Sequence, residues 1–227
     1  MIKTIEFTTF VDAYWKYYIT LEKRLIRTEE YVAFDEFNNN AYSIEFLSLL
    51  QIICSEIDVL AKAIVTFYDS EFKAKNAGIH KWGFELQQHF PELTDQNIIF
   101  RESRTFVPWA GWKIEKVADK NGRLYYKYAE GQKSPAWWNA YNKVKHARTT
   151  IEKENINYRN ANQKNVLLAL SALFLLNRFM MKELNPKGYP TIEKSSIFAV
   201  YGWNDEMTES LLVNDNGSVT MIVKSPW

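Results

Sequence analysis

The sequence predicts a mainly α protein: an antiparallel helical bundle with a β-hairpin insertion and a β-rich C-terminal tail. Apolar residues recur at helical spacing in several long blocks. Between and after these blocks lie β-prone runs that flank Asn-Gly dipeptides, which favour tight hairpin turns. We therefore expect a single domain over residues 1–227, with 97–133 as a β-hairpin insertion and 189–227 as a C-terminal β extension.

The first half of the chain is predicted to be helical. Phe7 to Phe37 has the pattern of one long amphipathic helix or two, and residues 38–40, all asparagine, mark the break. Ser43 is a suitable N-cap for the next helix, with Glu45 in its first turn. Apolar residues in that helix then return every three or four positions, at Leu47, Leu50, Cys54, Ile57, Ala61 and Ile64.

Helical spacing fades after Phe90, and strands are the better prediction there. Trp112 to Val117 and Arg123 to Tyr128 flank a turn that contains Asn121-Gly122. This segment is the predicted hairpin insertion. Basic residues and tyrosines are mixed along it, as in surfaces that bind single-stranded nucleic acid. Its candidate RNA-binding residues are Arg123, Lys127 and Lys113, while alternation along the strand suggests that some of the tyrosines pack inward.

The last part of the chain is predicted to hold a core helix and a second hairpin. Val166 to Met181 is the most hydrophobic run, but polar residues interrupt it and it is shorter than a membrane span needs. We therefore interpret it as a core helix. Ser210 to Val213 and Val219 to Val223 flank Asn216-Gly217 and predict the hairpin of the tail.

Residues Ser134 to Arg148 form the most informative stretch. Ser134 is placed to cap a helix, and Pro135 suits the first helical position. One arc of this helix is predicted to face the core, formed by Trp137, Ala140, Tyr141, Val144, Ala147 and Ile151. Beside that arc Asn142, Lys145 and His146 form a polar patch. An imidazole in such a patch is suited to acid–base catalysis, although a solvated or structural role for His146 is an equal alternative.

Two further charged residues are predicted to face inward. Glu56 is surrounded by apolar residues on its helix, and Arg148 continues the apolar arc of the 134–148 helix. A buried carboxylate needs a cationic or hydrogen-bonding partner. The sequence therefore predicts a structural ion pair between Glu56 and Arg148. The other histidines, His80 and His89, fall in a stretch that looks like a loop, and we expect surface roles for both.

Composition narrows the function classes. Lys and Arg number 28 against 27 Asp and Glu, so no global field attracts nucleic acid and an anion site must be local. The only cysteine, Cys54, excludes an internal disulfide, and no Cys/His cluster has zinc-site spacing. We expect no metal and no cofactor. The first ten residues lack the apolar core of a signal peptide, which predicts a cytoplasmic protein without membrane contact.

The stretch YNKVKH, Tyr141 to His146, resembles the motif of the HEPN superfamily of small α-helical domains. In that family an arginine, usually followed by a polar residue, precedes a histidine by four to six positions. Asn142 matches the polar position and His146 the histidine, while Tyr141 occupies the position of the arginine. Lys145 is the nearest candidate for the missing positive charge.

The resemblance implies an HEPN-like bundle and a metal-independent endoribonuclease that cleaves or binds RNA, in a phage-defence or toxin–antitoxin system. It implies a homodimer in which two motif helices form one cleft, with His146, Asn142 and Lys145 as catalytic residues. The alternative is a catalytically inactive HEPN-like interaction module or scaffold that binds a protein partner, which the tyrosine at position 141 favours. A small-molecule binding bundle has no specific residue in its support.

Overall fold

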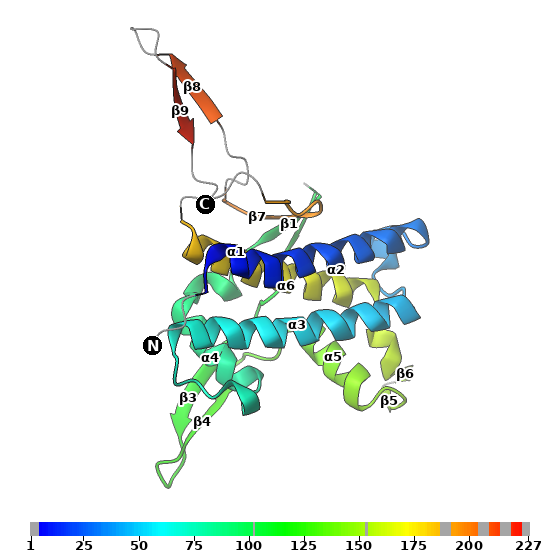
Figure 1. Cartoon of the computed structure of the whole chain (residues 1–227). Coiled ribbons are helices and arrows are strands. Elements are labelled where there is room, and N and C mark those ends of the chain that lie inside the picture. Colours follow the sequence, from blue (N-terminus) through cyan, green and yellow to red (C-terminus); the bar gives the residue numbers. More distant parts are fainter. Residues whose placement is uncertain are drawn as a thin grey trace.

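The computed structural model describes residues 5–101, 103–152, 154–186, 192–203, 209–213 and 219–223 (Figure 1). It confirms a mainly α fold with small antiparallel sheets. The helices of this described part are α1 (Phe7–Phe10), α2 (Lys16–Arg27), α3 (Ile44–Tyr68), α4 (Ile79–His89), α5 (Ala136–His146) and α6 (Gln163–Leu184).

The first predicted helix is shorter and less regular than its hydrophobic pattern suggests. A π-helical turn, Val11–Trp15, joins α1 to α2, and a 3₁₀ turn, Thr28–Glu30, follows α2. The hydroxyl of Thr28 donates a hydrogen bond to the Leu25 carbonyl at 2.6 Å. This local bond competes with the helical pattern at the point where α2 ends. The prediction of helix as far as Phe37 is therefore wrong.

Helices α3 and α6 form the centre of the molecule. Ser43 caps α3, as predicted, by accepting a hydrogen bond from the Phe46 amide at 3.0 Å. α6 begins beside the start of α3, because the Gln163 amide donates to the Ala41 carbonyl at 2.9 Å. The two helices therefore run parallel, with the most extensive contact of any helix pair in the described chain.

The other two helices of the bundle run the opposite way. The end of α2 lies at the start of α3, where the Arg24 guanidinium contacts Glu45 and Ser48. The end of α5 lies beside the turn that precedes α6 (Figure 1). Successive helices of the set α2, α3, α5 and α6 thus alternate in direction, as expected for an antiparallel bundle.

The predicted core helix α6 is buried on nearly every side. It is long and apolar enough to cross a membrane, and it is the one such helix in the described residues. In the fold, however, 83% of its most apolar window is buried. One charged residue of α6, Arg178, is only 6% exposed, and its guanidinium lies near the rings of Phe174 and Trp203.

Tryptophans fill the space between α3, α4 and α5. The rings of Trp82, Trp109, Trp112, Trp137 and Trp138 contact one another in a continuous cluster. The Trp82 indole donates to the Asp58 carboxylate at 2.9 Å, and the Trp137 indole donates to the Pro108 carbonyl at 2.7 Å. The high aromatic content of the sequence is thus used in packing at this place.

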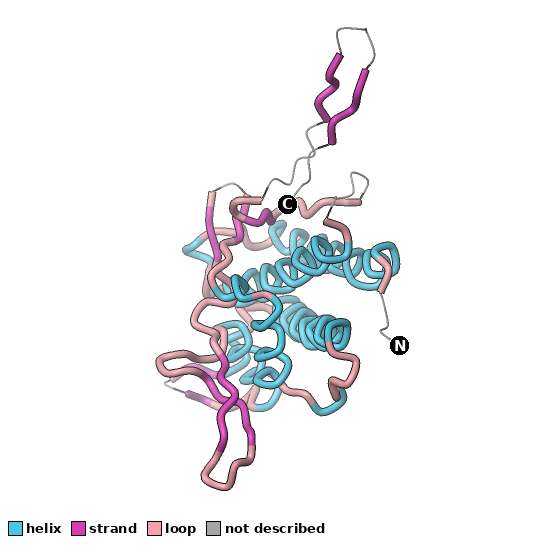
Figure 2. The backbone as a smooth tube through the Cα atoms, turned by 90° about the vertical axis from the view of Figure 1, so that its left-hand side faces the viewer, coloured by secondary structure: helices cyan, strands magenta, loops and turns pink. Residues whose placement is uncertain are grey.

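The first predicted hairpin is confirmed, and it projects from the helices (Figure 2). Its strands are β3 (Ile114–Ala118) and β4 (Leu124–Tyr128), with Ile114 opposite Tyr128. The hairpin of the tail is also confirmed, as β8 (Glu209–Val213) and β9 (Val219–Val223). Its turn at Asn216-Gly217 lies outside the described residues. A third pair, β5 (Ile151–Glu152) and β6 (Asn155–Ile156), follows α5.

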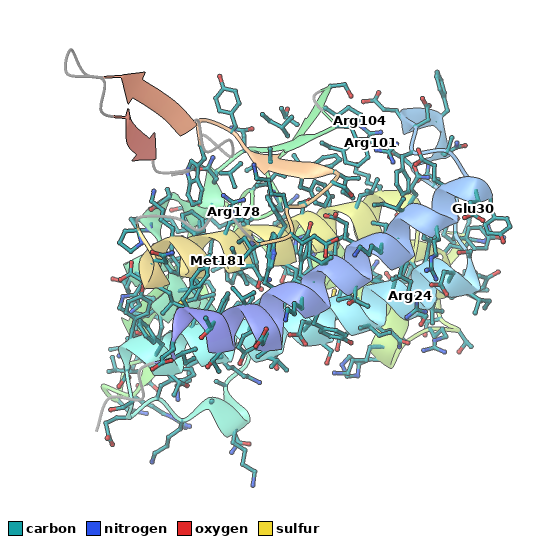
Figure 3. The ribbon with its side chains drawn as sticks, turned by 45° about the horizontal axis from the view of Figure 1, so that its top comes forward. Arg24, Glu30, Arg101, Arg104, Arg178 and Met181 are labelled. Carbon is teal, nitrogen blue, oxygen red and sulfur yellow. The ribbon has the colours of Figure 1, made fainter. Side chains whose placement is uncertain are left out.

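The predicted insertion and the predicted C-terminal extension meet in one sheet. Strand β1 (Ile98–Phe100) pairs with β2 (Arg104–Phe106) on one side and with β7 (Phe198–Val200) on the other. Figure 3 shows Arg101 and Arg104 on this sheet and Arg178 on α6. The Phe198 ring lies 5.7 Å from that of Phe174 on α6. The tail therefore contributes to the core.

Gly83 in α4 gives a test of the tryptophan packing. A Cβ atom at this position would lie 2.3 Å from the ring of Trp112 and 2.7 Å from Ile114. We expect Gly83→Ala to lower the free energy of unfolding by about 1–3 kcal/mol, despite the higher helix propensity of alanine. The matched control is Gly78→Ala, because that position has open space around it. Urea unfolding measures both, and equal losses would show that the Trp112 contact is not restrictive.

Candidate functional site

Helix α5 starts one residue later than the sequence suggests. Pro135 occupies the N-cap position and Ala136 is the first helical residue, without a side-chain cap. The Ser134 hydroxyl instead forms a hydrogen bond with the Tyr128 hydroxyl of β4. The prediction of Ser134 as the cap is therefore wrong, because a tertiary partner takes its side chain.

The inward arc of α5 is confirmed up to the last turn. Trp137, Ala140, Tyr141 and Val144 are all buried. The helix then ends at His146, so the predicted continuation of the arc does not form. Ile151 lies in β5 and is 69% exposed.

The polar patch lies at the C-terminal end of α5. Lys145 and His146 are exposed, and Asn142 is partly exposed one turn earlier. The side chains of Asn142 and His146 have no hydrogen-bond or ion-pair partner among the described residues. The Lys145 ammonium lies 5.2 Å from the centre of the Tyr141 ring. The fold therefore leaves this patch open to a ligand.

The predicted ion pair between Glu56 and Arg148 is not formed. Arg148 is exposed, and its Nε donates to the Val144 carbonyl at 3.3 Å. Because α5 ends before Arg148, the helical spacing that placed this side chain inward no longer applies. The guanidinium instead folds back against the last turn of α5. It adds a permanent positive charge to the exposed end of α5, at a residue predicted to lie in the core.

Glu56 is a half-buried carboxylate on α3 without an ion pair in the described chain. Burial raises the pKa of this carboxyl above its usual range. The negative charge of Glu56 in turn contributes to a raised pKa of Tyr14, after the larger effect of burial on that phenol. Glu56 therefore lies toward the N-terminal helices and not beside α5.

A segment after α5 holds the end of this helix in place. The Asn157 carboxamide donates to the Ala147 carbonyl at 3.1 Å and to the Glu152 carboxylate at 3.0 Å. The Tyr158 amide donates to the Arg148 carbonyl at 3.0 Å. Lys143 forms an ion pair with Glu152 at 2.6 Å. We call residues 147–160 the clamp segment. Asn157 is 1% exposed, and nothing in the sequence distinguishes it from the other asparagines nearby.

The histidines outside α5 lie on a helix, so the prediction of a loop there is wrong. His80 and His89 are both in α4. The His80 ring lies 4.5 Å from that of Tyr128, and burial lowers the pKa of this histidine. His89 stacks on Tyr68 with ring centres 3.8 Å apart. Both imidazoles of α4 pack against tyrosines, and both are distant in sequence from the α5 patch.

The β3–β4 hairpin presents one packed face and one open face. Tyr126 and Tyr128 lie against Phe84 and His80 of α4. The alternate residues point the other way, where Tyr125 is 46% exposed and Lys127 lies 4.0 Å from Glu115. The predicted RNA-binding residues Lys113 and Arg123 are exposed near the two ends of the hairpin. The three cations thus form a strip along the hairpin rather than a cluster.

Neither a cysteine site nor a metal site is formed by the described residues. Cys54 is fully buried in α3, and burial raises the pKa of its thiol. No group of three His, Cys, Asp or Glu in the described ranges could hold a metal ion. The α5 patch contains an amide, an ammonium group, an imidazole and a guanidinium group, a combination that suits an anion.

The sequence matches no known protein family, no curated protein and no solved structure in comparisons with each.

The raised pKa of Glu56 predicts a stabilising substitution. An acid whose pKa is raised by folding makes the folded state less stable when it is ionised, above that pKa. We expect Glu56→Gln to raise the melting temperature at pH 7 by about 1–2 °C, a small effect because the carboxyl is half exposed. The gain should shrink as the pH falls through the raised pKa of the folded carboxyl and disappear below the usual glutamate pKa of about 4.3, where the carboxyl is protonated in the folded and unfolded states. Exposed Glu71→Gln is the control, and a lower melting temperature for Glu56→Gln would reveal a stabilising partner.

Proposed function

We propose that this protein is an HEPN-like, metal-independent endoribonuclease whose site is the end of α5. The observation that carries the proposal is that Lys145, His146 and Arg148 are exposed there, with Asn142 partly exposed beside them, and that none of the four has an ion-pair partner in the described part of the chain. Lys143 is the exception, since Glu152 pairs with it. A histidine with nearby cations and no metal is the set of groups needed to cleave RNA by its own 2′-hydroxyl.

In the proposed reaction, the neutral imidazole of His146 takes the proton of the 2′-hydroxyl. The 2′-oxygen forms a bond to phosphorus, and the bond from phosphorus to the 5′-oxygen breaks. A second acid gives a proton to the leaving 5′-oxygen. The products are a 2′,3′-cyclic phosphate and a free 5′-hydroxyl. Lys145 and Arg148 offset the negative charge that develops on the phosphate oxygens, and Asn142 orients the phosphate.

In this proposal, Arg148 supplies the positive charge that the arginine provides in the HEPN motif. Tyr141, which occupies that position, is 7% exposed and lies against Trp138, so it is a core residue. Arg148 follows His146 in sequence but folds back to the Val144 carbonyl. Its guanidinium therefore lies at the end of α5, two residues after His146 in sequence, and it carries a permanent positive charge.

A homodimer would supply the second acid. One copy offers one imidazole at the end of α5, whereas the reaction uses a base and an acid. Two copies joined through the polar side of α5 would bring two His146 side chains to one phosphate. The open polar patch of α5 supports such a contact.

The alternative function is a catalytically inactive HEPN-like interaction module. The burial of Tyr141 favours it, because this position can hold no phosphate-binding side chain. Cations at a helix C-terminus also stabilise the helix, which gives Lys145 and Arg148 a structural reason to be present. In this case the patch would bind a protein partner or RNA without cleaving it.

His146→Ala tests the catalytic proposal. Loss of a general acid–base group lowers a cleavage rate by about 10²–10⁴-fold, so we expect a decrease of this size on total RNA or transfer RNA. The products of the wild-type protein should carry 2′,3′-cyclic phosphate ends. The control is His89→Ala, which removes an exposed imidazole on α4. Equal cleavage by wild type and His146→Ala, or cleavage by neither, would contradict the nuclease proposal.

The hairpin cations predict a separate effect on RNA affinity. We expect the triple substitution of Lys113, Arg123 and Lys127 by alanine to weaken binding of single-stranded RNA. It should also flatten the slope of log Kd against log salt by about 2, because about 0.7 counterions are released for each phosphate contact. Binding is measured in the His146→Ala background so that the RNA stays intact.

A control triple substitution removes the same charge elsewhere, at exposed Lys73, Lys75 and Lys194. If both triple variants change the slope equally, the hairpin has no specific part in RNA binding.

A further inference from the structure

A second feature is formed by the clamp segment together with residues near the start of α3 and of α6. It is a cavity of about 390 Å³, within the size range of small-molecule pockets. Asparagine amides dominate its lining, which includes Asn40, Tyr42, Asn155, Arg159, Asn160 and Asn162. The sequence analysis assigned no role to any of these residues. We call this cavity the amide pocket.

The amides of this pocket are only partly used by the fold. Asn160 donates through its Nδ2 to the Asn157 carbonyl at 2.9 Å, which leaves its Oδ1 as an acceptor. Asn162 accepts through its Oδ1 from the Asn165 amide at 3.0 Å, which leaves its Nδ2 as a donor. The side chains of Asn40 and Asn155 have no hydrogen-bond partner among the described residues. The pocket thus offers a fixed acceptor, a fixed donor and two adaptable amides.

The pocket also has a flat, stacked wall. The Tyr42 and Tyr158 rings meet edge to face with centres 5.4 Å apart. The Arg159 guanidinium lies over the Tyr42 ring at 5.4 Å. Tyr42 is 43% exposed, so part of its ring remains free. Aromatic rings and guanidinium planes are the surfaces on which proteins stack unpaired RNA bases.

The pocket is joined to the end of α5 by hydrogen bonds. Tyr158, which precedes the pocket residue Arg159, donates to the Arg148 carbonyl at 3.0 Å, and Asn157 donates to the Ala147 carbonyl at 3.1 Å. His146 immediately precedes these two carbonyl residues. A single-stranded RNA with its phosphate at His146 therefore has this pocket within reach for a neighbouring base.

We infer that the amide pocket binds one unstacked base of a single-stranded RNA, and that the base it prefers is adenine. Adenine presents a donor, its N6 amino group, beside an acceptor ring nitrogen; cytosine offers the same pair, but the larger purine ring of adenine covers more of the stacking surface. The Asn160 acceptor and the Asn162 donor match these two groups, and Tyr42 with Arg159 supplies the stacking surface. The inference rests on the proposed function only for the identity of the ligand as RNA, and it is tested by binding alone.

The test compares the four tetraribonucleotides A4, C4, G4 and U4 as fluorescently labelled probes. The protein carries His146→Ala, so no probe is cleaved. We expect A4 to bind about 5- to 100-fold more tightly than G4 and U4, and more tightly than C4 through its larger stacking surface. Asn162→Ser removes the Nδ2 donor but keeps an oxygen that caps α6, and Asn155→Ala removes an exposed amide, so both variants should fold. Each is expected to reduce the preference for A4.

Gln88→Ala is the control, because it removes an exposed amide from α4, outside the pocket. Equal binding of the four probes, no binding of any, preference for another base, or a preference for A4 that survives in Asn162→Ser would overturn the inference. None of these results touches the cleavage assay with His146→Ala. Selective A4 binding by a protein that cleaves no RNA would conversely support the pocket and contradict the nuclease proposal.

Discussion

The structure depends most on the burial of α6, a helix that is apolar around nearly its whole circumference. Each large aliphatic side chain removed from water contributes about 1.5–3 kcal/mol to the stability of the fold. Every side of this helix is therefore more stable when another element packs against it. Helices α2, α3 and α5 and strand β7 provide it. Polar groups inside this core need partners as well. The Asn177 carboxamide, for example, donates to the Leu173 carbonyl at 3.0 Å. The bundle and the small sheet are therefore parts of one arrangement around α6.

This constraint also decides which parts of α5 are free. Trp137, Ala140, Tyr141 and Val144 are committed to packing, so chemistry can use only the opposite side and the helix end. Tyr141 shows the consequence most clearly. Its ring fills space beside Trp138, and a guanidinium in its place would have to be buried without a carboxylate in the motif helix to pair with it. A cation of the proposed site must therefore come from the exposed side of α5, as Lys145 does, or from beyond its last turn, where Arg148 lies.

Hydrophobic period and turn chemistry predicted α3, α6 and the β3–β4 and β8–β9 hairpins, because each of these features is determined mainly by residues close in sequence. The end of α5 was not predictable in this way. No glycine or proline follows His146, and the stop coincides with bonds from Asn157 and Tyr158 to the Ala147 and Arg148 carbonyls. The β1–β7 pairing is also nonlocal. The same limit applies to the site: Asn142, Lys145 and His146 were found from spacing, whereas the exposure of Arg148 and the amide pocket depend on the clamp segment.

The position of the candidate site at a helix C-terminus sets a physical condition on its function. The carbonyl end of a helix is negative, with about half an elementary charge, and it disfavours a phosphate. Bonds from Asn157 and Tyr158 satisfy two carbonyls just after the helix, and the nearby cations oppose the remaining field. Helix stabilisation alone would require cations of any kind. It gives no reason for the unpartnered amide of Asn142 one turn earlier, or for an imidazole in place of another ammonium. These two side chains, rather than the net positive charge, are the features that favour the proposed phosphate site over a purely structural helix end.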